Sequence, residues 1–112
     1  LDKASKINGG VYYYVGSHKL GLLKHKPSFA PGSSQTIKSI NKLKKYKIVI
    51  PKLNPGDCII HNSLVVHGSK KNNSNKSRRG ITLRYIPFRT KILSNSKRDD
   101  EKSLKKQIVE RI

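Results

Sequence analysis

The chain has 112 residues, which is enough for one domain or for part of one. Only 34% of the residues are hydrophobic, so a modest core is expected and a deep, enclosed one is not. No apolar run approaches the roughly 20 residues that a membrane-spanning helix needs, and the N-terminus lacks the pattern of a secretion signal.

The formal net charge of +19 would ordinarily favour a nucleic-acid or membrane partner. Most of that charge is lysine, however, because only six of the 25 basic residues are arginine. Lysine grips phosphates and bases less well than arginine, and an A/T-rich coding sequence would also produce this bias toward Lys, Asn and Ile. We therefore do not expect a nucleic-acid partner, and we keep a small basic nucleic-acid-binding protein as an alternative.

The single cysteine, Cys58, has no internal disulfide partner and lies in the apolar run DCII, where a small buried side chain is expected. A lone thiol is typical of a reducing compartment, so the predicted location is cytoplasmic. Methionine does not occur in the chain, which predicts that the sequence is a piece of a longer protein.

The first half of the chain predicts one strand followed by a long loop. Residues 11–15, VYYYV, are β-branched or aromatic and lie between Gly9-Gly10 and Gly16-Ser17, as in a short strand between turns. Residues 21–45 mix Gly, Pro, Ser and Lys, so a surface loop is expected, with a short helical turn near Ser39–Lys45. Loops of this length often bind ligands or cover a site.

The second half predicts several short strands separated by turns. The expected strands are Lys47–Ile50, Cys58–His61, Leu64–His67 (a strand or a continuation past a bend) and Ile81–Phe88. A strong turn signal at Asn54–Asp57 precedes the second of these strands, and a polar loop at Lys70–Ser77 precedes the last.

The charged tail, residues 91–112, predicts a short helix because Leu104, Ile108 and Ile112 fall on one helical face. Short strands between Pro/Gly turns, with no long helix between them, favour a mainly β fold of the sandwich or jelly-roll type. We expect residues 1–90 to form the β domain and the tail to follow it.

Histidine and arginine stand at the two ends of the loop between the last two expected strands. His67 closes one strand and Arg78 opens the next, and an antiparallel hairpin places such strand ends roughly 5 Å apart. Imidazole suits Fe, Zn, Cu or Ni, and a guanidinium grips a carboxylate through two parallel hydrogen bonds. The pair therefore predicts a site where a metal and a carboxylate-bearing ligand meet.

Two other histidines carry weaker signals. His61 lies six residues before His67, an even spacing that would place both side chains on one strand face. The intervening pair Asn62-Ser63 is expected to bend the strand and separate them, so a structural role is favoured for His61. His25, in a loop of Lys and Pro, is likewise expected to be structural or exposed.

Two segments carry a recognisable motif pattern. The first is NGGVYYYVGSHKLG, residues 8–21, and the second runs from Pro55 to Tyr85 with the elements GD, HGS and RR. Together they resemble the C-terminal half of the phytanoyl-CoA dioxygenase family of iron(II)/2-oxoglutarate oxygenases, over Leu1 to about Phe88. The resemblance implies a cupin-like double-stranded β-helix, of which this chain would be the C-terminal portion.

The resemblance also implies residue roles. His67 looks like the distal histidine of the iron-binding facial triad. Arg78 looks like the arginine that binds the far carboxylate of 2-oxoglutarate, and Ser69 like a second contact to it. Arg79 is an alternative to Arg78, although strand alternation would turn it to the other face, where an ion pair or solvent exposure is expected.

Three further residues, Tyr12, Tyr14 and His18, lie in the segment that borders the substrate pocket in relatives. For the two tyrosines, core packing is an equal alternative. The family's other iron ligands form a His-x-Asp pair, and no histidine of this chain is followed two residues later by an acidic residue. Val15 also replaces the proline that is common before the GSH element.

The implied reaction of the complete protein uses Fe(II), 2-oxoglutarate and O₂, with ascorbate as an accessory reductant. An unactivated C–H bond is hydroxylated while 2-oxoglutarate is decarboxylated to succinate. This chain alone is expected to be inactive, because two of the three iron ligands are not in it. A non-catalytic jelly-roll binding module, with His67 structural, remains the third alternative.

Overall fold

The computed structural model describes residues 1–28, 30, 33 and 35–91, and this part is mainly β, as expected. The chain divides into two compact units, Leu1–Leu22 with Ile40–Leu83 and Leu23–Ser39 with Arg84–Ile112. The expected tail helix lies outside the described residues. The expected boundary at residue 90 stays a prediction.

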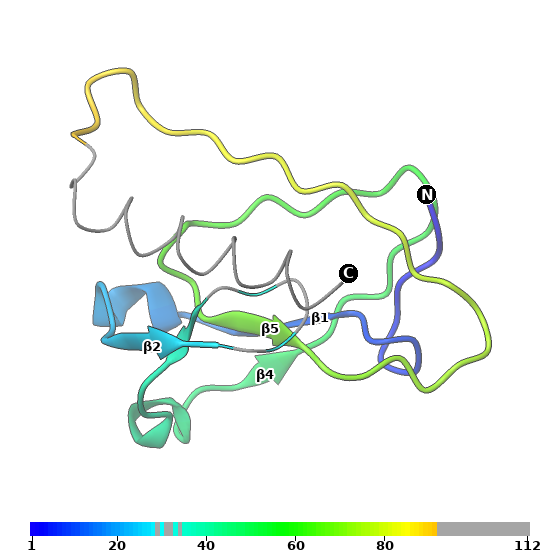
Figure 1. Ribbon diagram of the computed structural model, residues 1–112, viewed down its shortest axis with the longest axis horizontal. Coiled ribbons are helices and arrows are strands. Elements are labelled where there is room, and N and C mark those ends of the chain that lie inside the picture. The colour runs from blue at the N-terminus through cyan, green and yellow to red at the C-terminus, as the bar shows by residue number, and fades with distance from the viewer. Residues whose placement is uncertain (29, 31–32, 34, 92–112) are drawn as a thin grey trace. The chain divides into compact units, whose positions relative to one another are not determined.

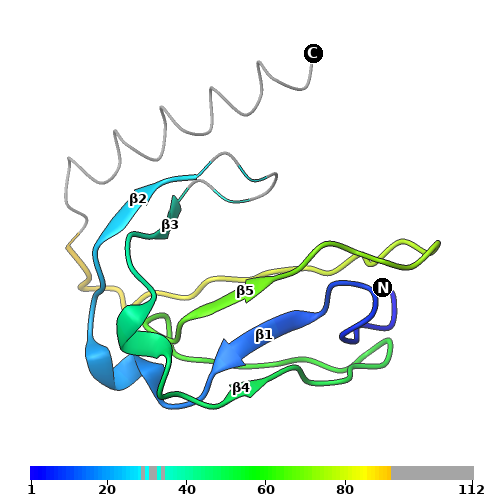
Figure 2. The same cartoon turned by 90° about the horizontal axis from the view of Figure 1, so that it is seen from below.

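The first unit is built on an antiparallel three-stranded sheet with β1 in the middle (Figure 1 and Figure 2). Strand β1 (Val11–Tyr14) pairs with β4 (Ile48–Val49) on one side and with β5 (His67–Ser69) on the other. Tyr13 is opposite Val49 in one pairing and opposite His67 in the other. The strands expected from residues 11–15 and 47–50 are therefore confirmed, each slightly shorter.

A tight turn before β1 determines where this strand begins. The Asn8 side chain closes the turn, since its Oδ1 accepts the Ser5 N–H at 2.7 Å and its Nδ2 donates to the Lys3 carbonyl at 2.7 Å. The Gly10 N–H then donates to the Ser5 carbonyl at 2.7 Å. Gly9 has φ +75°, a conformation that residues with a Cβ rarely adopt, and both glycines are buried.

The core of the described part is small, as the composition predicts. Leu43 is the only buried large hydrophobic side chain among the described residues, at 1% exposure. Leu43 ends the 3₁₀ turn η2 (Asn41–Leu43), which confirms the helical turn expected near residues 39–45. A second 3₁₀ turn, η1 (Ser17–Leu20), follows β1 directly, and its Ser17 is fully buried.

The second unit contains a hairpin that the sequence did not predict. Strands β2 (His25–Pro27) and β3 (Gln35–Ile37) pair antiparallel, with Lys26 opposite Thr36, within the segment expected to be a surface loop. The two strands are exposed except for Ile37, so they lack the alternation of buried and exposed side chains that signals a strand. Cross-strand hydrogen bonds define this hairpin, and a sequence does not reveal them directly.

Two expected strands are not formed in the described part of the chain. Cys58–His61 and Ile81–Phe88 have no ladder partner, and β5 begins only at His67 and continues to Ser69. A strand needs a neighbour to satisfy its backbone groups, and neither segment has one among the described residues. Their apolar side chains are consequently open to solvent, Ile60 by 95% and Phe88 by 103%. Cys58 is also exposed, which contradicts the buried thiol expected for it.

Candidate functional site

The first residue of β5, His67, lies at the edge of the three-stranded sheet beside Tyr13 of the central strand. The two side chains share a sheet face, since they are directly opposite in the register and their rings stack at 5.8 Å with planes 27° apart. The His67 side chain is exposed, and its Nδ1 lies 2.9 Å from the Val65 carbonyl oxygen. A carbonyl can only accept, so in the neutral ring Nδ1 carries the proton and Nε2 keeps its lone pair.

A buried serine determines how the chain enters β5. The Ser17 hydroxyl accepts the Val66 N–H at 2.8 Å across 49 residues of sequence, and the Val66 carbonyl accepts the Tyr14 N–H at 2.9 Å. Both bonds act on the residue directly before His67. Ser17 belongs to the GSHK element but was not singled out from the sequence, because a serine pattern does not show which distant amide it will meet.

His61 approaches His67 closely, contrary to the expectation that the bend between them would separate the two side chains. The bend is present, with the Asn62 Oδ1 accepting the Leu64 N–H at 2.8 Å and the Asn62 carbonyl accepting the Val65 N–H at 3.0 Å. It turns the chain back, so that the two imidazole centroids are 4.8 Å apart. The spacing of six residues was the available signal, and the direction of the bend decided the outcome.

Tyr13 lies beside both histidines, which we call the His61–His67 pair. Its ring lies 5.2 Å from that of His61 and 5.8 Å from that of His67. Partial burial removes water from the phenol and raises the pKa of Tyr13 above its ordinary value of 10.0, so the hydroxyl stays protonated at neutral pH. Sequence analysis did not select Tyr13, because three consecutive tyrosines cannot be told apart without the register.

The two neighbouring tyrosines lie on the opposite face of β1 from Tyr13 by strand alternation. Tyr12 is opposite Gly68, where an added Cβ would come within 2.6 Å of the Tyr12 hydroxyl, so the ring covers the glycine. The rings of Tyr12 and Tyr14 meet edge to face at 6.0 Å. Their expected place beside the substrate pocket stays a prediction, and their observed contacts are packing contacts.

The remaining predicted site residues are Ser69, His18 and Arg78. Ser69 ends β5 two residues after His67, which places both on one side of the strand. His18 is exposed in η1. Arg78 is half-buried and makes no ion pair with the carboxylates in the described part of the chain.

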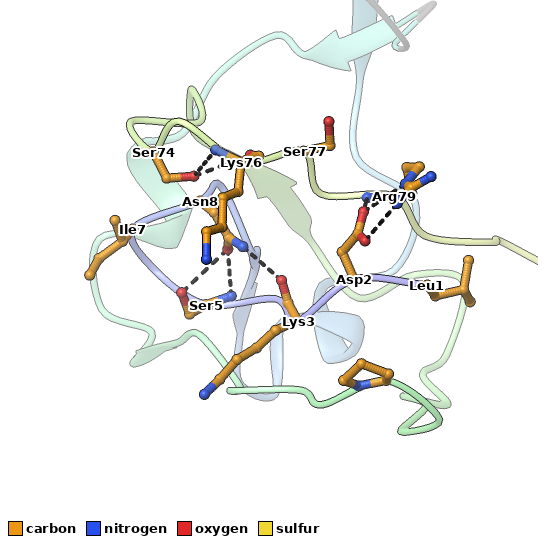
Figure 3. A pocket seen from close by; sticks show the side chains of 11 residues that line it. Leu1, Asp2, Lys3, Ser5, Ile7, Asn8, Ser74, Lys76, Ser77 and Arg79 are labelled. Atoms are coloured by element: carbon orange, nitrogen blue, oxygen red, sulfur yellow. Dashed lines mark hydrogen bonds and ion pairs between the residues drawn. The ribbon is translucent and has the colours of Figure 1, made fainter.

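Arg79 is exposed and also forms an ion pair, and these were the two alternatives expected for it. Its Nε donates to Asp2 Oδ2 at 2.9 Å, its Nη2 donates to Oδ1 at 3.0 Å, and its backbone N–H donates to Oδ2 at 2.8 Å. Figure 3 shows the two side chains facing each other. Both line an open hollow of about 750 Å³. Lys3, Lys76, Ser74 and Ser77 are among its lining residues.

Asp2 should therefore titrate far below an ordinary aspartate. The side-chain hydrogen bonds from Arg79, reinforced by that residue's backbone N–H, lower the pKa of Asp2 from 3.8 to about 2. Because the folded-state pKa is the lower one, the stabilisation is complete above pH 3.8 and is lost as the pH falls through about 2. A carboxyl-detected NMR titration should give a midpoint near 2, rising toward 3.8 in Arg79→Gln but not in Arg78→Gln. A parent midpoint near 3.8 would contradict the pair.

Two properties of the described residues bear on the kind of site this is. No group of three or more His, Cys, Asp or Glu side chains in that part of the chain is arranged to hold a metal ion. None of the helices described there is long and apolar enough to cross a membrane. The described residues thus offer imidazoles and a guanidinium, but not a complete set of metal ligands.

Comparison with known proteins places the motif pattern in one family. The family model for phytanoyl-CoA dioxygenase (PhyH) matches residues 1–80, which is more than half of the chain. No curated protein and no solved structure gives a significant match. The matched region contains the NGG turn, β1, the GSHK element, β5 and both arginines, and by that match the chain belongs to the phytanoyl-CoA dioxygenase family.

Proposed function

We propose that this chain is the C-terminal part of an Fe(II)/2-oxoglutarate-dependent oxygenase that hydroxylates an unactivated C–H bond of a small-molecule substrate. The family match over residues 1–80 is the observation that carries the proposal. The cosubstrate 2-oxoglutarate is decarboxylated to succinate in the same reaction. The described residues fit an iron site in part, because they provide imidazole but no facial triad of ligands.

His67 is the proposed iron ligand of this chain. Ligating histidines in metal sites usually donate the second ring N–H to a carbonyl or carboxylate, which fixes the tautomer and the ring orientation. The bond from His67 Nδ1 to the Val65 carbonyl is of this kind and leaves Nε2 for the metal. When bound, the iron supplies the activation of O₂ and of the keto acid. The chain supplies the position of the imidazole.

Arg78 is the proposed anchor for the far carboxylate of 2-oxoglutarate. Its neighbour Arg79 already holds Asp2 through both oxygens, so the guanidinium of Arg79 is satisfied within the protein. Arg78 forms no ion pair with a described residue, and a forked guanidinium suits a bidentate grip on a carboxylate. Ser69, on the same side of β5 as His67, is the proposed second contact.

The other two iron ligands are proposed to come from a part of the protein outside these 112 residues. The exposed apolar side chains of the unpaired segments Cys58–His61 and Ile81–Phe88 support this, because such surfaces are normally covered by further strands. The chain alone should then form no succinate from 2-oxoglutarate. The coding sequence upstream of Leu1 is the direct test. A His-x-Asp pair there would support the assignment, and an upstream region without one would contradict it.

Exchange of Arg78 should separate its role from that of Arg79. We expect Arg78→Ala to lower the affinity of the chain for 2-oxoglutarate, measured by NMR in the presence of Mn²⁺, by at least about tenfold, because a charge-assisted bidentate contact is worth roughly 1.5–3 kcal/mol. Arg79→Ala is the matched control, since its guanidinium is engaged with Asp2. Equal losses in the two variants, or no loss in Arg78→Ala, would reject the assignment.

A further inference from the structure

The His61–His67 pair has an arrangement that the family motif does not require. The two rings approach to 4.8 Å and their planes are tilted by 53°. Both side chains are exposed, and the half-buried ring of Tyr13 lies beside them. Two side chains capable of binding a transition metal therefore meet here.

Both imidazoles are held in the same tautomer. The His61 Nδ1 lies 3.0 Å from the Asn62 carbonyl oxygen, just as the His67 Nδ1 lies 2.9 Å from that of Val65. Each carbonyl can only accept, so each Nδ1 donates, and in the neutral ring each Nε2 is left as a donor atom for a metal.

The separation of the rings also suits a shared metal ion. A metal–imidazole bond of about 2.0–2.1 Å places two rings on one ion with centroids roughly 4.5–5.2 Å apart, for bond angles between octahedral and tetrahedral values. The observed 4.8 Å falls in this interval. Tyr13 forms the apolar wall against which both rings rest, which limits their rotation away from each other.

We propose that His61 and His67 bind a divalent transition metal together, through their two Nε2 atoms. The proposal rests on the proposed function only for His67, and it adds His61 as a ligand of the same site. A facial-triad site leaves three positions open, so His61 can occupy one of them before the cosubstrate binds. The ions expected to bind are those that imidazole favours. The affinity for Cu²⁺ should be higher than that for Zn²⁺ or Ni²⁺.

Titration of the 112-residue chain with Ni²⁺ tests the proposal without relying on activity. We expect one tight site by calorimetry. His61→Ala and His67→Ala should each weaken it by at least the roughly 10–100-fold that loss of a residue behind a metal ligand typically costs. In free energy, the double variant should lose less than the sum of the two single losses, because losing either ring already breaks the chelate. His25→Ala and Cys58→Ser are matched controls that remove an exposed imidazole or thiol elsewhere, and neither should change the affinity.

The outcomes distinguish this proposal from the proposed function. If His61→Ala binds Ni²⁺ within about twofold of the parent while His67→Ala does not, the pair is refuted and His67 keeps its iron role. If both variants lose the Ni²⁺ site but Arg78→Ala leaves the affinity for 2-oxoglutarate unchanged, the metal-binding pair stands and the oxygenase assignment fails. A second measurement covers misfolded variants. In the parent, imidazole ¹⁵N spectra should show both neutral rings protonated at Nδ1, and an Nε2-protonated His61 would overturn the proposal.

Discussion

Gly9→Ala is expected to disrupt the three-stranded sheet and, with it, the position of His67. Gly9 has φ +75°, where a side chain costs roughly 1–2 kcal/mol, and an added Cβ would lie 2.7 Å from the Lys70 carbonyl oxygen. Overpacking against backbone that cannot retreat costs typically a further 1–3 kcal/mol. The sum is a large part of the free energy of unfolding of a small domain, which starts at about 5 kcal/mol.

Two other glycines separate the two contributions to this effect. A Cβ added at Gly10 would lie 2.6 Å from the Ser5 carbonyl oxygen, and Gly10 has no positive φ, so Gly10→Ala measures the steric clash alone. Gly56 has φ +96° with nothing within 4 Å, so Gly56→Ala measures the backbone strain alone. Urea denaturation followed by circular dichroism should rank Gly9→Ala as the most destabilising. A cost for Gly9→Ala no larger than that for Gly56→Ala would contradict the packing seen around the NGG turn.

Self-association of the isolated chain is expected to be strong and to increase with salt. Ile60, Ile81 and Leu83 of the first unit are exposed by 95%, 71% and 69%, and burial of each such side chain is worth roughly 1.5–3 kcal/mol. The net charge of +19 opposes association at low ionic strength. Salt shortens the Debye length to about 10 Å at 0.1 M, which removes that opposition and leaves the apolar attraction.

Lysine substitution on the exposed apolar segments should reverse this behaviour. We expect Ile60→Lys with Leu83→Lys to keep the chain monomeric by light scattering at salt concentrations where the parent associates. Thr36→Lys adds the same kind of charge at an exposed position of β3 and should leave association unchanged. A parent chain that stays monomeric at every salt concentration would show that these apolar surfaces need no cover, and would remove a support for the proposed missing strands.

Local sequence signals predicted the parts of the fold that depend on neighbouring residues. The β-branched and aromatic run from Val11 to Tyr14 forms β1, and the expected helical turn contains η2. The predicted strands were wrong where strand formation depends on pairing with a distant segment. Ile81–Phe88 has the alternation of a strand but no partner in the described residues, while the hairpin of β2 and β3 forms without that alternation. A strand is defined by hydrogen bonds to another segment, and periodicity reports only on the segment itself.

The amino-acid sequence by itself determined the family, through the NGG, GSHK, HGS and RR elements, and it selected His67, Arg78 and Ser69 as candidate residues. The tertiary structure decided which neighbours those residues have. Arg79 forms an ion pair with Asp2, and Tyr13 rather than Tyr12 lies against His67. The ring centroids of His61 and His67 are 4.8 Å apart. A sequence motif identifies which chemical groups are present but not which groups lie next to them. The direction of a bend and the register of a sheet are set by hydrogen bonds over long sequence distances, such as that between Ser17 and Val66.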